Sequence, residues 1–274
     1  MRKILGKEIA QGVIERLKKM ERPKKYLTAI LVGDDPGSLN FIEQKRKLAE
    51  ALGVDFRLYR FARDIKNDSL RKEVSRLSAQ KKTGGVIIQL PLPEGLNRHY
   101  ILNAVPREKD LDVLGERALG SFYTSRQLVL PPAVGTLEEI LKSTGFNLEE
   151  ADVAVVGAGL LIGRPIALWL LGRCKNLTII DSRGDASLVS RADLIILGAG
   201  RPGLVSRAAL KPDAKVVDFG YALDDSGRVS GDFKILSEET AEEDGGWYTP
   251  TPGGTGPVLV AKILENFFLL NRDA

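Results

Sequence analysis

One stretch decides the fold of this chain: Val153-Ala-Val-Val-Gly-Ala-Gly-Leu-Leu-Ile-Gly-Arg-Pro165. Its first four residues, Val153 to Val156, are all apolar, which predicts a strand buried on both faces of a parallel sheet. A helix is predicted to follow from Pro165 to Leu171. A strand, a glycine-rich turn and a helix in this order indicate a nucleotide-binding unit. A plain strand–turn–helix is the alternative interpretation.

The glycines of this turn, Gly157, Gly159 and Gly163, form the pattern G-x-G-x-x-x-G. Glycine allows a tight turn and a close approach of phosphate to the backbone, and the N-terminus of the following helix offers N–H groups and a partial positive charge. The third glycine comes one residue later than in the usual G-x-G-x-x-G. Asp181 ends the next apolar run, near the spacing of about 20 residues expected for a carboxylate that binds the adenosine ribose. Capping of the next helix is the alternative role for Asp181.

The composition limits the class of protein. The chain has 274 residues, of which 43% are hydrophobic and 28% charged, as in a globular protein with room for two domains. The net charge is only +4 and the basic residues are spread out, so we expect no nucleic-acid partner. A single cysteine, Cys174, and a single histidine, His99, leave no metal site of zinc spacing. The apolar runs are shorter than about 18 residues and the N-terminus is too polar for a signal peptide, so we expect no membrane partner and a cytoplasmic location.

Strands and helices alternate along the chain, which predicts an α/β fold with parallel sheets and right-handed crossovers. Ser38 is predicted to be the N-cap of its helix, and the break at Pro131-Pro132 predicts a hinge between two domains. The predicted strands are 26–32, 54–59, 86–88, 153–156, 177–180, 194–197 and 215–218, and the predicted helices are 7–20, 39–52, 69–78, 97–104, 136–143, 165–171 and 258–270.

Four side chains stand where a site could form. Phe41 and Lys45 share one face of a predicted helix, as an aromatic platform beside an amine whose pKa burial would lower. Gln89 follows the third predicted strand, where the carboxyl ends of parallel strands face a ligand crevice. Asp112 lies in a polar loop. Each has an ordinary alternative role. Lys45 could be solvated with Phe41 in the core, Gln89 could be a loop amide, and Asp112 could be a surface carboxylate.

Six motifs in one order cover nearly the whole chain. They are Ile4-Leu-Gly-Lys-Glu-Ile-Ala10, Ser38-x-x-Phe-x-x-x-Lys-Arg-Lys47, Val86-Ile-Ile-Gln-Leu-Pro-Leu-Pro93, Pro106-x-x-Lys-Asp-x-Asp112, Val155-Val-Gly-x-x-x-x-Ile-Gly-Arg-Pro165 and Thr249-Pro-x-Pro-Gly-Gly-x-Gly-Pro257. This series resembles the bifunctional methylenetetrahydrofolate dehydrogenase/methenyltetrahydrofolate cyclohydrolase family.

The resemblance implies a fold and a reaction. A three-layer α/β catalytic domain would comprise residues 1–135, completed by the C-terminal segment 251–274, whose helix packs back on it. A Rossmann-like parallel-sheet domain at 136–250 would bind NAD or NADP. The implied reactions are oxidation of 5,10-methylenetetrahydrofolate to the methenyl form and hydrolysis of that product to 10-formyltetrahydrofolate. The resemblance also implies a cleft between the two domains and a homodimer.

The resemblance assigns roles to individual residues. Lys45 would be the essential lysine, Gln89 its hydrogen-bond partner and Asp112 the carboxylate that grips the pterin ring. The implied substrate-binding residues are Ser38, Phe41, Leu90, Pro91, Pro252, Gly253 and Gly254. The implied cofactor-binding residues are Gly157, Ala158, Gly159, Gly163, Asp181, Ser182, Ala199, Gly200 and Tyr221.

The chain departs from the family pattern on the folate side. Phe41 stands where the family usually has tyrosine, so a hydroxyl is missing, and hydrolysis would suffer more from this loss than hydride transfer. Val113 stands where the family has glycine, so the loop behind Asp112 is expected to bend differently.

The chain also departs from the pattern at the cofactor loop. Ala158-Gly159 and Asp181-Ser182 stand where many members have Arg-Ser and His-Ser, residues that fit the extra phosphate of NADP. Losing a cation and gaining an anion should repel a 2′-phosphate, whereas Asp181 can accept hydrogen bonds from a free ribose diol. We therefore expect a preference for NAD, although Arg183 could swing in to bind a phosphate.

Three alternatives remain open from the sequence. The first is a dehydrogenase that has lost the cyclohydrolase activity. The second is an oxidoreductase of the same build that acts on another pterin or on a hydroxy acid. The third is a folate- or nucleotide-binding protein without turnover, which the joint presence of Lys45, Gln89 and Asp112 disfavours.

Overall fold

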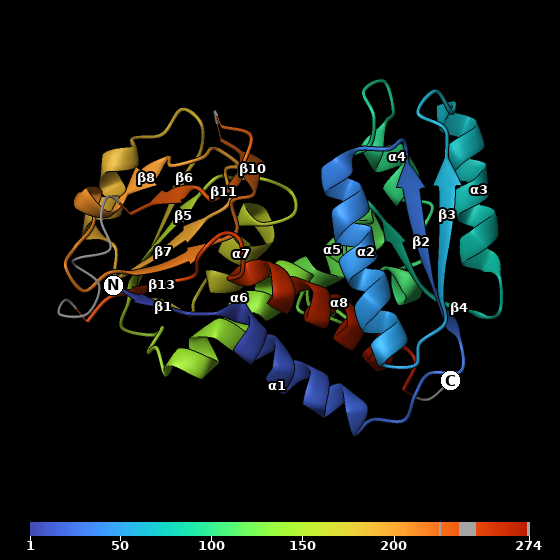
Figure 1. The fold of residues 1–274 in the computed structure, drawn as a ribbon, viewed down its shortest axis with the longest axis horizontal. Coiled ribbons are helices and arrows are strands. Elements are labelled where there is room, and N and C mark those ends of the chain that lie inside the picture. Colours follow the sequence, from blue (N-terminus) through green and yellow to red (C-terminus); the bar gives the residue numbers. More distant parts are fainter. Residues whose placement is uncertain (225, 236–244, 273–274) are drawn as a thin grey trace. The chain divides into compact units, whose positions relative to one another are not determined.

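The computed structural model describes residues 1–224, 226–235 and 245–272 of the chain. The chain divides into two compact units (Figure 1). The glycine-loop unit comprises residues 1–12 and 133–259, and the Lys45 unit comprises residues 13–132 and 260–274. Within the described ranges, the helices are all too short or too polar to cross a membrane.

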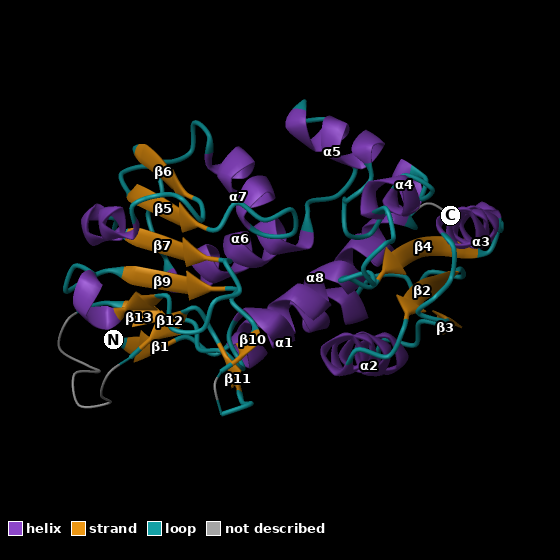
Figure 2. Cartoon of the chain, turned by 90° about the horizontal axis from the view of Figure 1, so that it is seen from above, coloured by secondary structure: helices purple, strands orange, loops and turns teal. Residues whose placement is uncertain are grey.

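A six-stranded parallel sheet organises the glycine-loop unit, in the strand order β1-β13-β9-β7-β5-β6 (Figure 2). The chain passes from β5 to the edge strand β6 and then returns to the other side of β5 as β7. In open α/β sheets, ligands bind beyond the carboxyl ends of the strands where the order reverses in this way. The strands are β1 (Arg2–Lys3), β5 (Asp152–Val156), β6 (Asn176–Ile180), β7 (Leu194–Leu197), β9 (Lys215–Asp218) and β13 (Trp247–Tyr248).

Burial of apolar side chains explains why this sheet forms. All four residues of β7 are buried, as are the last four of β5, as expected for central strands covered on both faces. Helix α7 (Gly163–Leu170) turns Ile166 and Leu170 inward. The remaining elements of the unit are α6 (Pro132–Thr144), η2 (Ala186–Arg191), η3 (Arg207–Ala209), the parallel pair β8 (Val205–Ser206) and β12 (Phe233–Lys234), and the antiparallel pair β10 (Ala222–Leu223) and β11 (Val229–Ser230).

A three-stranded parallel sheet, in the order β3-β2-β4, organises the Lys45 unit. The central strand, β2 (Tyr26–Val32), is buried at all seven positions. Its neighbours are β3 (Phe56–Phe61) and β4 (Thr83–Ile88). The other elements are α2 (Pro36–Ala51), α3 (Asn67–Ala79), α4 (Arg98–Leu102), η1 (Arg107–Lys109) and α5 (Glu116–Tyr123), together with α1 (Gly6–Lys18) and α8 (Thr255–Leu270), each of which begins in the residues of the other unit.

The C-terminal segment is tied to the Lys45 unit by two asparagines. Asn266 Nδ2 donates to the carbonyls of Leu111 and Leu130 at 2.8 and 2.9 Å. Asn271 Nδ2 donates to the carbonyl of Gly84 at 3.0 Å. The prediction that the C-terminal helix packs back on the first domain is therefore confirmed, as is the two-domain α/β fold.

The prediction that Ser38 caps its helix is wrong. Helix α2 begins at Pro36, and its N-cap is Asp35, whose Oδ2 accepts the backbone N–H of Ser38 at 2.8 Å. Aspartate caps a helix at least as well as serine, and proline in the first turn has no N–H to satisfy. Ser38 is therefore already inside the helix, on its buried face.

Candidate functional site

Lys45 and Gln89 meet in the interior of the Lys45 unit. Helix α2 turns Lys45 inward on the face that also buries Ile42 and Ala49, so that Lys45 is only 7% exposed. Gln89 directly follows β4, and its backbone N–H donates to the carbonyl of Ile30 at 2.9 Å. Lys45 Nζ donates to Gln89 Oε1 at 2.9 Å. The alternative of a solvated lysine is therefore wrong, and the expected hydrogen bond is present.

A second hydrogen bond fixes how Gln89 presents its amide. Gln89 Nε2 donates to the carbonyl of Leu90 at 2.7 Å, which leaves Oε1 as the atom that accepts from Lys45. The Leu90–Pro91 peptide bond that follows is cis. Because an ammonium and a neutral amine both carry N–H, this contact holds the lysine in place in either protonation state.

Asp112 lies close enough to Lys45 for the two charges to act on each other. Burial lowers the pKa of Lys45, and attraction to Asp112 opposes this shift. Burial likewise raises the pKa of Asp112, and attraction to Lys45 opposes it. Burial is the larger influence in both cases, so both groups are drawn toward their neutral forms. The amine is therefore more available as a base than an exposed lysine would be.

A neighbouring carboxylate, Asp110, holds the loop that carries Asp112. Asp110 is 5% exposed, and its Oδ2 accepts the backbone N–H groups of Leu114 and Gly115 at 2.9 and 2.7 Å. Burial raises the pKa of Asp110 to about 6, the charge of Asp112 adds to the rise, and the backbone N–H groups oppose it. Asp110 thus shapes the loop, while Asp112 is the carboxylate whose charge acts on the lysine.

The raised pKa of Asp110 should appear in the pH dependence of stability. Between about pH 4 and 6, the folded protein holds a proton at Asp110 that the unfolded chain has released, so stability falls as the pH rises through this range and levels off above it. A pKa of about 6 in place of the ordinary 3.8 corresponds to about 3 kcal/mol. Asp110→Asn keeps an acceptor for the backbone and removes the titration. Urea unfolding at pH 4.5 and 7 should show that the wild type loses about 2 kcal/mol more than the variant; parallel losses would contradict this.

Val113 keeps a glycine-like backbone although it is a β-branched residue. Its φ is 56°, in the left-handed region that favours glycine, and its side chain is only 2% exposed. The loop was expected to bend differently because valine replaces glycine, yet at Val113 itself the conformation is one that glycine would suit. Burial of the valine side chain, at about 2 kcal/mol, offsets a backbone strain of about 1–3 kcal/mol.

Substitutions at Val113 should therefore reverse the usual order of alanine and glycine. Val113→Ala loses the buried methyl groups and keeps the strain, whereas Val113→Gly loses both, so the glycine variant should be about 1 kcal/mol more stable than the alanine variant. Val74, fully buried within α3, is the matched control, and there glycine should be about 1 kcal/mol worse than alanine. Thermal or urea unfolding of the four variants measures both differences, and the same order at both positions would refute the strain.

The seven residues implied to bind substrate are divided between the two units. Ser38, Phe41, Leu90 and Pro91 belong to the Lys45 unit, and Pro252, Gly253 and Gly254 belong to the glycine-loop unit. The turn that holds the last three contains a second cis peptide, Thr251–Pro252, and the N–H of Gly6 donates to the carbonyl of Gly253 at 2.9 Å. The binding roles of all seven stay predictions.

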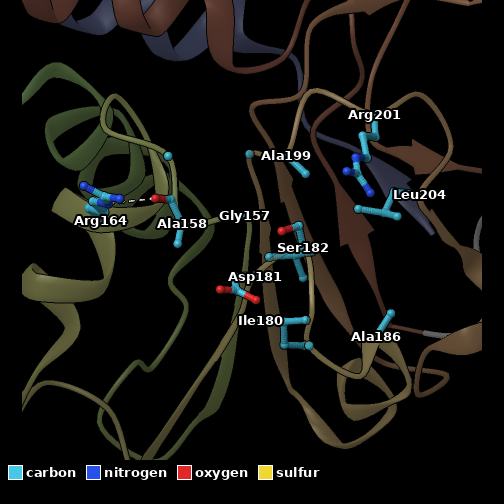
Figure 3. A pocket seen from close by; sticks show the side chains of 14 residues that line it. Gly157, Ala158, Arg164, Ile180, Asp181, Ser182, Ala186, Ala199, Arg201 and Leu204 are labelled. Atoms are coloured by element: carbon cyan, nitrogen blue, oxygen red, sulfur yellow. Dashed lines mark hydrogen bonds between the residues drawn. The ribbon is translucent and has the colours of Figure 1, made fainter.

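A cavity of about 410 Å³ lies at the carboxyl ends of β5, β6 and β7 in the glycine-loop unit. Figure 3 shows Asp181 and Ser182 between Arg164 with Ala158 on one side and Arg201 with Leu204 on the other. The cavity is lined by Val156, Gly157, Ala158, Gly159, Arg164, Ile180, Asp181, Ser182, Gly184, Ala186, Gly198, Ala199, Arg201 and Leu204. Its position is the one that the strand order predicts for a ligand.

Two glycines are required by the packing of the turn. Gly157 has a φ of 96°, and a Cβ on it would lie 2.6 Å from the carbonyl oxygen of Gly198. A Cβ on Gly163 would lie 1.7 Å from the carbonyl oxygen of Gly157. The third glycine of the motif therefore serves the close contact between turn and helix, as in dinucleotide-binding folds.

Asp181 caps its own turn and lines the cavity. Its Oδ1 accepts the backbone N–H of Arg183 at 2.9 Å, and its side chain is 47% exposed. The N-cap of the following helix η2 is instead Asp185, which accepts the N–H of Ser187. The alternative in which Asp181 caps the next helix is therefore wrong. Arg183 is 90% exposed, with Nη2 3.9 Å from Asp181 Oδ2.

The cavity contains most, but not all, of the residues implied to bind the cofactor. Six of them line it, whereas Gly163, Gly200 and Tyr221 do not, and the roles of all nine stay predictions. Sequence reasoning missed the cations Arg164 and Arg201, although both stand beside glycines that it had marked. A glycine cradle, a carboxylate, two cations and apolar side chains fit the phosphates, ribose and base of a dinucleotide.

The fold and the two sites define a class of protein: two-domain α/β proteins in which a dinucleotide-binding parallel sheet accompanies a second, smaller α/β unit with a buried lysine. Within that class, the chain belongs to the tetrahydrofolate dehydrogenase/cyclohydrolase family. The profile of the family's catalytic domain matches residues 2–112, and the profile of its NAD(P)-binding domain matches residues 131–273.

Individual relatives are similar over almost their full length. The bifunctional protein FolD of Staphylococcus haemolyticus is 32% identical over 276 residues, covering 98% of this chain and 95% of that protein. The FolD crystal structure from Campylobacter jejuni has a TM-score of 0.89 at 29% identity, with 98% and 97% of the two chains covered. The Trypanosoma brucei FolD, solved with NADP and an inhibitor, has a TM-score of 0.89 at 27% identity and the same coverage. The expected family and enzyme class are confirmed.

Proposed function

We propose that this protein oxidises 5,10-methylenetetrahydrofolate to the 5,10-methenyl form and hydrolyses that product to 10-formyltetrahydrofolate, with Lys45, Gln89 and Asp112 at the reacting site. The observation that carries the proposal is the buried Lys45, which donates to Gln89 and lies under the influence of Asp112. The relatives from C. jejuni and T. brucei are described as methylenetetrahydrofolate dehydrogenases and cyclohydrolases, which supports the same reactions here.

The side chains of the Lys45 unit suit a pterin. A pterin edge offers an amide N–H and an amino group, and the carboxylate of Asp112 can accept both. Phe41 lies one helical turn before Lys45 on α2 and can stack on the aromatic part of the folate. When bound, the dinucleotide accepts the hydride that leaves the one-carbon bridge between the two folate nitrogens.

Hydrolysis requires two proton movements that one amine can perform. Water adds to the methenyl carbon, and neutral Lys45 takes a proton from it. The bond from that carbon to one folate nitrogen then breaks, and the protonated Lys45 returns the proton to the leaving nitrogen. The remaining hydroxyl proton goes to solvent as the formyl carbonyl forms. Gln89 keeps the amine in place through both transfers.

Two assays on the purified protein test this function. One follows the formation of NADH or NADPH from 5,10-methylenetetrahydrofolate, and the other follows loss of methenyltetrahydrofolate above its spontaneous hydrolysis. Both activities together support the proposal. Reduction of cofactor without enzymatic hydrolysis would leave a dehydrogenase alone, and binding without either reaction would leave a folate-binding protein. Activity with a different pterin only would overturn the choice of substrate.

The proposal includes NAD as the preferred cofactor. The carboxylate of Asp181 lines the cavity, and Ala158 stands where many family members have arginine. A carboxylate accepts hydrogen bonds from the free 2′- and 3′-hydroxyls of NAD and repels the 2′-phosphate of NADP. The two cations of the cavity, Arg164 and Arg201, remain for the pyrophosphate and the base, and Arg164 Nε is already committed to the carbonyl of Ala158 at 2.9 Å.

The proposal also includes a cytoplasmic homodimer. Ile179 in the edge strand β6 is 53% exposed, and Leu171, which precedes this strand in the chain, is 62% exposed. Among the described residues β6 pairs with β5 alone, so its outer edge is one that a second copy can cover. Light scattering should give a mass of about 60 kDa, twice the 29.9 kDa of one chain. A mass of one chain at micromolar concentration would refute the dimer.

A further inference from the structure

The side chain of Asp232 binds the backbone of the loop that follows β7. Its Oδ2 accepts the backbone N–H groups of Ala199 and Gly200 at 2.6 and 3.1 Å, and its Oδ1 accepts the N–H of Arg201 at 2.6 Å. Three successive N–H groups thus bind one carboxylate, the arrangement by which a backbone nest binds an anion. Asp232 is fully buried and is not among the residues that line the cavity.

The hydrogen bonds to Asp232 determine which groups of the loop at residues 199–201 face the cavity. Because its N–H groups are committed to Asp232, the loop offers the cavity side chains, of which Ala199 and Arg201 are part of the lining (Figure 3). Gly200 between them has a φ of 65°. Charge-assisted hydrogen bonds are roughly twice as strong as neutral ones, so three of them on consecutive residues fix the backbone from which Arg201 projects.

A second buried carboxylate, Asp218, fixes Asp232 in turn. Asp218 Oδ1 accepts the backbone N–H groups of Gly220 and Asp232 at 2.7 and 3.3 Å, and its Oδ2 accepts the N–H of Phe233 at 3.0 Å. The backbone of Asp218 is bound to the start of α8, because Thr255 Oγ1 donates to its carbonyl at 2.9 Å. The cavity loop and the glycine-rich turn before α8 are therefore joined through these two carboxylates.

Two glycines near these carboxylates stand at positions where a larger residue would clash with them. A Cβ on Gly220 would lie 2.4 Å from Asp232 Oδ1, and a Cβ on Gly231 would lie 2.0 Å from Asp218 Oδ2. Neither glycine has a left-handed backbone that would otherwise explain it. The local sequence is thus shaped around the carboxylates.

We infer that Asp232 is a positioning residue for dinucleotide binding, which acts by fixing the loop of Ala199, Gly200 and Arg201 against the cofactor cavity. The inference rests on the proposed use of this cavity by a nicotinamide dinucleotide. Figure 3 shows Arg201 beside Leu204, one of the apolar residues of the lining, and this part of the cavity is the one assigned to the base of the dinucleotide. Arg201 is placed there to face a flat base with its guanidinium.

The test is Asp232→Asn, which retains one acceptor oxygen in place of two and turns an NH₂ group toward backbone donors. Titration with NADH, followed by its fluorescence and in the absence of folate, should give a dissociation constant at least about tenfold higher than in the wild type. The KM for the dinucleotide should rise in the same proportion, while kcat at saturating dinucleotide changes by less than about threefold.

Asp193→Asn is the matched control because Asp193 stands at the opposite end of the same strand. Asp193 precedes β7, and its Oδ2 accepts the backbone N–H of Asp152 at 2.8 Å, far along the strand from the cavity loop. This variant should lower the unfolding temperature and leave the dissociation constant for NADH unchanged within about twofold. Equal affinities in the two variants would overturn the inference.

Amide hydrogen exchange keeps the inference testable if the Asp232 variant does not fold. In the wild type without cofactor, the amides of Ala199, Gly200 and Arg201 should exchange at least about 100-fold more slowly than that of an exposed loop glycine, Gly95. Rapid exchange at these three amides would overturn the role of Asp232. A wild type that fails to bind NADH would instead overturn the proposed function, so the two failures are distinguishable.

Discussion

Lys45→Met should abolish the enzymatic hydrolysis of methenyltetrahydrofolate and leave a measurable dehydrogenase. A general base contributes typically 10²–10⁴-fold, so the hydrolysis rate above the spontaneous reaction should fall by about that factor. Hydride transfer needs no proton from the lysine, and methionine fills nearly the same buried volume, so oxidation of methylenetetrahydrofolate should persist, with a loss of at most about tenfold.

Lys47→Met is the control for this substitution. Lys47 lies two residues along α2, is exposed, and pairs only at 3.7 Å with Glu43 on the surface. Its replacement makes the same change of side chain on the same helix and should leave both activities within about twofold, because surface ion pairs contribute little. An equal fall of hydrolysis in both variants, or unimpaired hydrolysis in Lys45→Met, would remove Lys45 from the mechanism.

The pH dependence of hydrolysis gives an independent view of the same amine. Burial lowers the pKa of Lys45 below its ordinary value of 10.5, so the neutral amine becomes available at a lower pH than for an exposed lysine. The rate of hydrolysis should therefore rise with pH along a limb that lies below 10.5 and that is missing in Lys45→Met. A limb at or above 10.5 would indicate that the lysine is not the base.

The sequence predicted the parts of this structure that local patterns determine. Strands β2, β7 and β9 have the expected bounds, because a run of apolar residues between turn signals is sufficient to mark a buried strand. Helix α2 was correctly predicted, but its N-cap was not. Asp35 and Ser38 are both residue types that cap helices well, and the backbone conformation before the helix determines which of them does so. Strand β3 lies two residues later than expected because its alternating residues, half exposed on an edge, mark its ends weakly.

The contacts that sequence reasoning missed join residues far apart in the chain. Asp232 is more than thirty residues from the loop that it holds, and neither segment carries a sequence pattern that predicts a contact with the other. Asp110 appeared only as an aspartate without an assigned role in the motif that ends at Asp112, and its burial is a product of tertiary packing. The contact between Lys45 and Gln89 was anticipated through family resemblance, since helix spacing alone left both residues with ordinary alternatives.

Cofactor choice should depend on the charge of Asp181, and the wild type should use NAD with a higher kcat/KM than NADP. A 2′-phosphate carries a charge near −1.5 to −2, and its repulsion by a half-exposed carboxylate is worth about 1–2 kcal/mol, or about 5- to 30-fold. Asp181→Asn keeps an oxygen for the N–H of Arg183 and removes that charge, so the ratio of kcat/KM for NADP to that for NAD should rise by this factor.

Asp185→Asn separates a local effect of Asp181 from a general effect of charge. Asp185 lies on the same segment, is exposed and does not line the cavity, and asparagine can still cap η2 in its place. Its removal takes away the same unit charge at a greater distance, so the cofactor ratio should change by less than about threefold. A wild type that prefers NADP would show that Arg183, 90% exposed and free to turn, outweighs Asp181. Equal shifts in the two variants would mean that the carboxylate acts only through the net charge of the cavity rim.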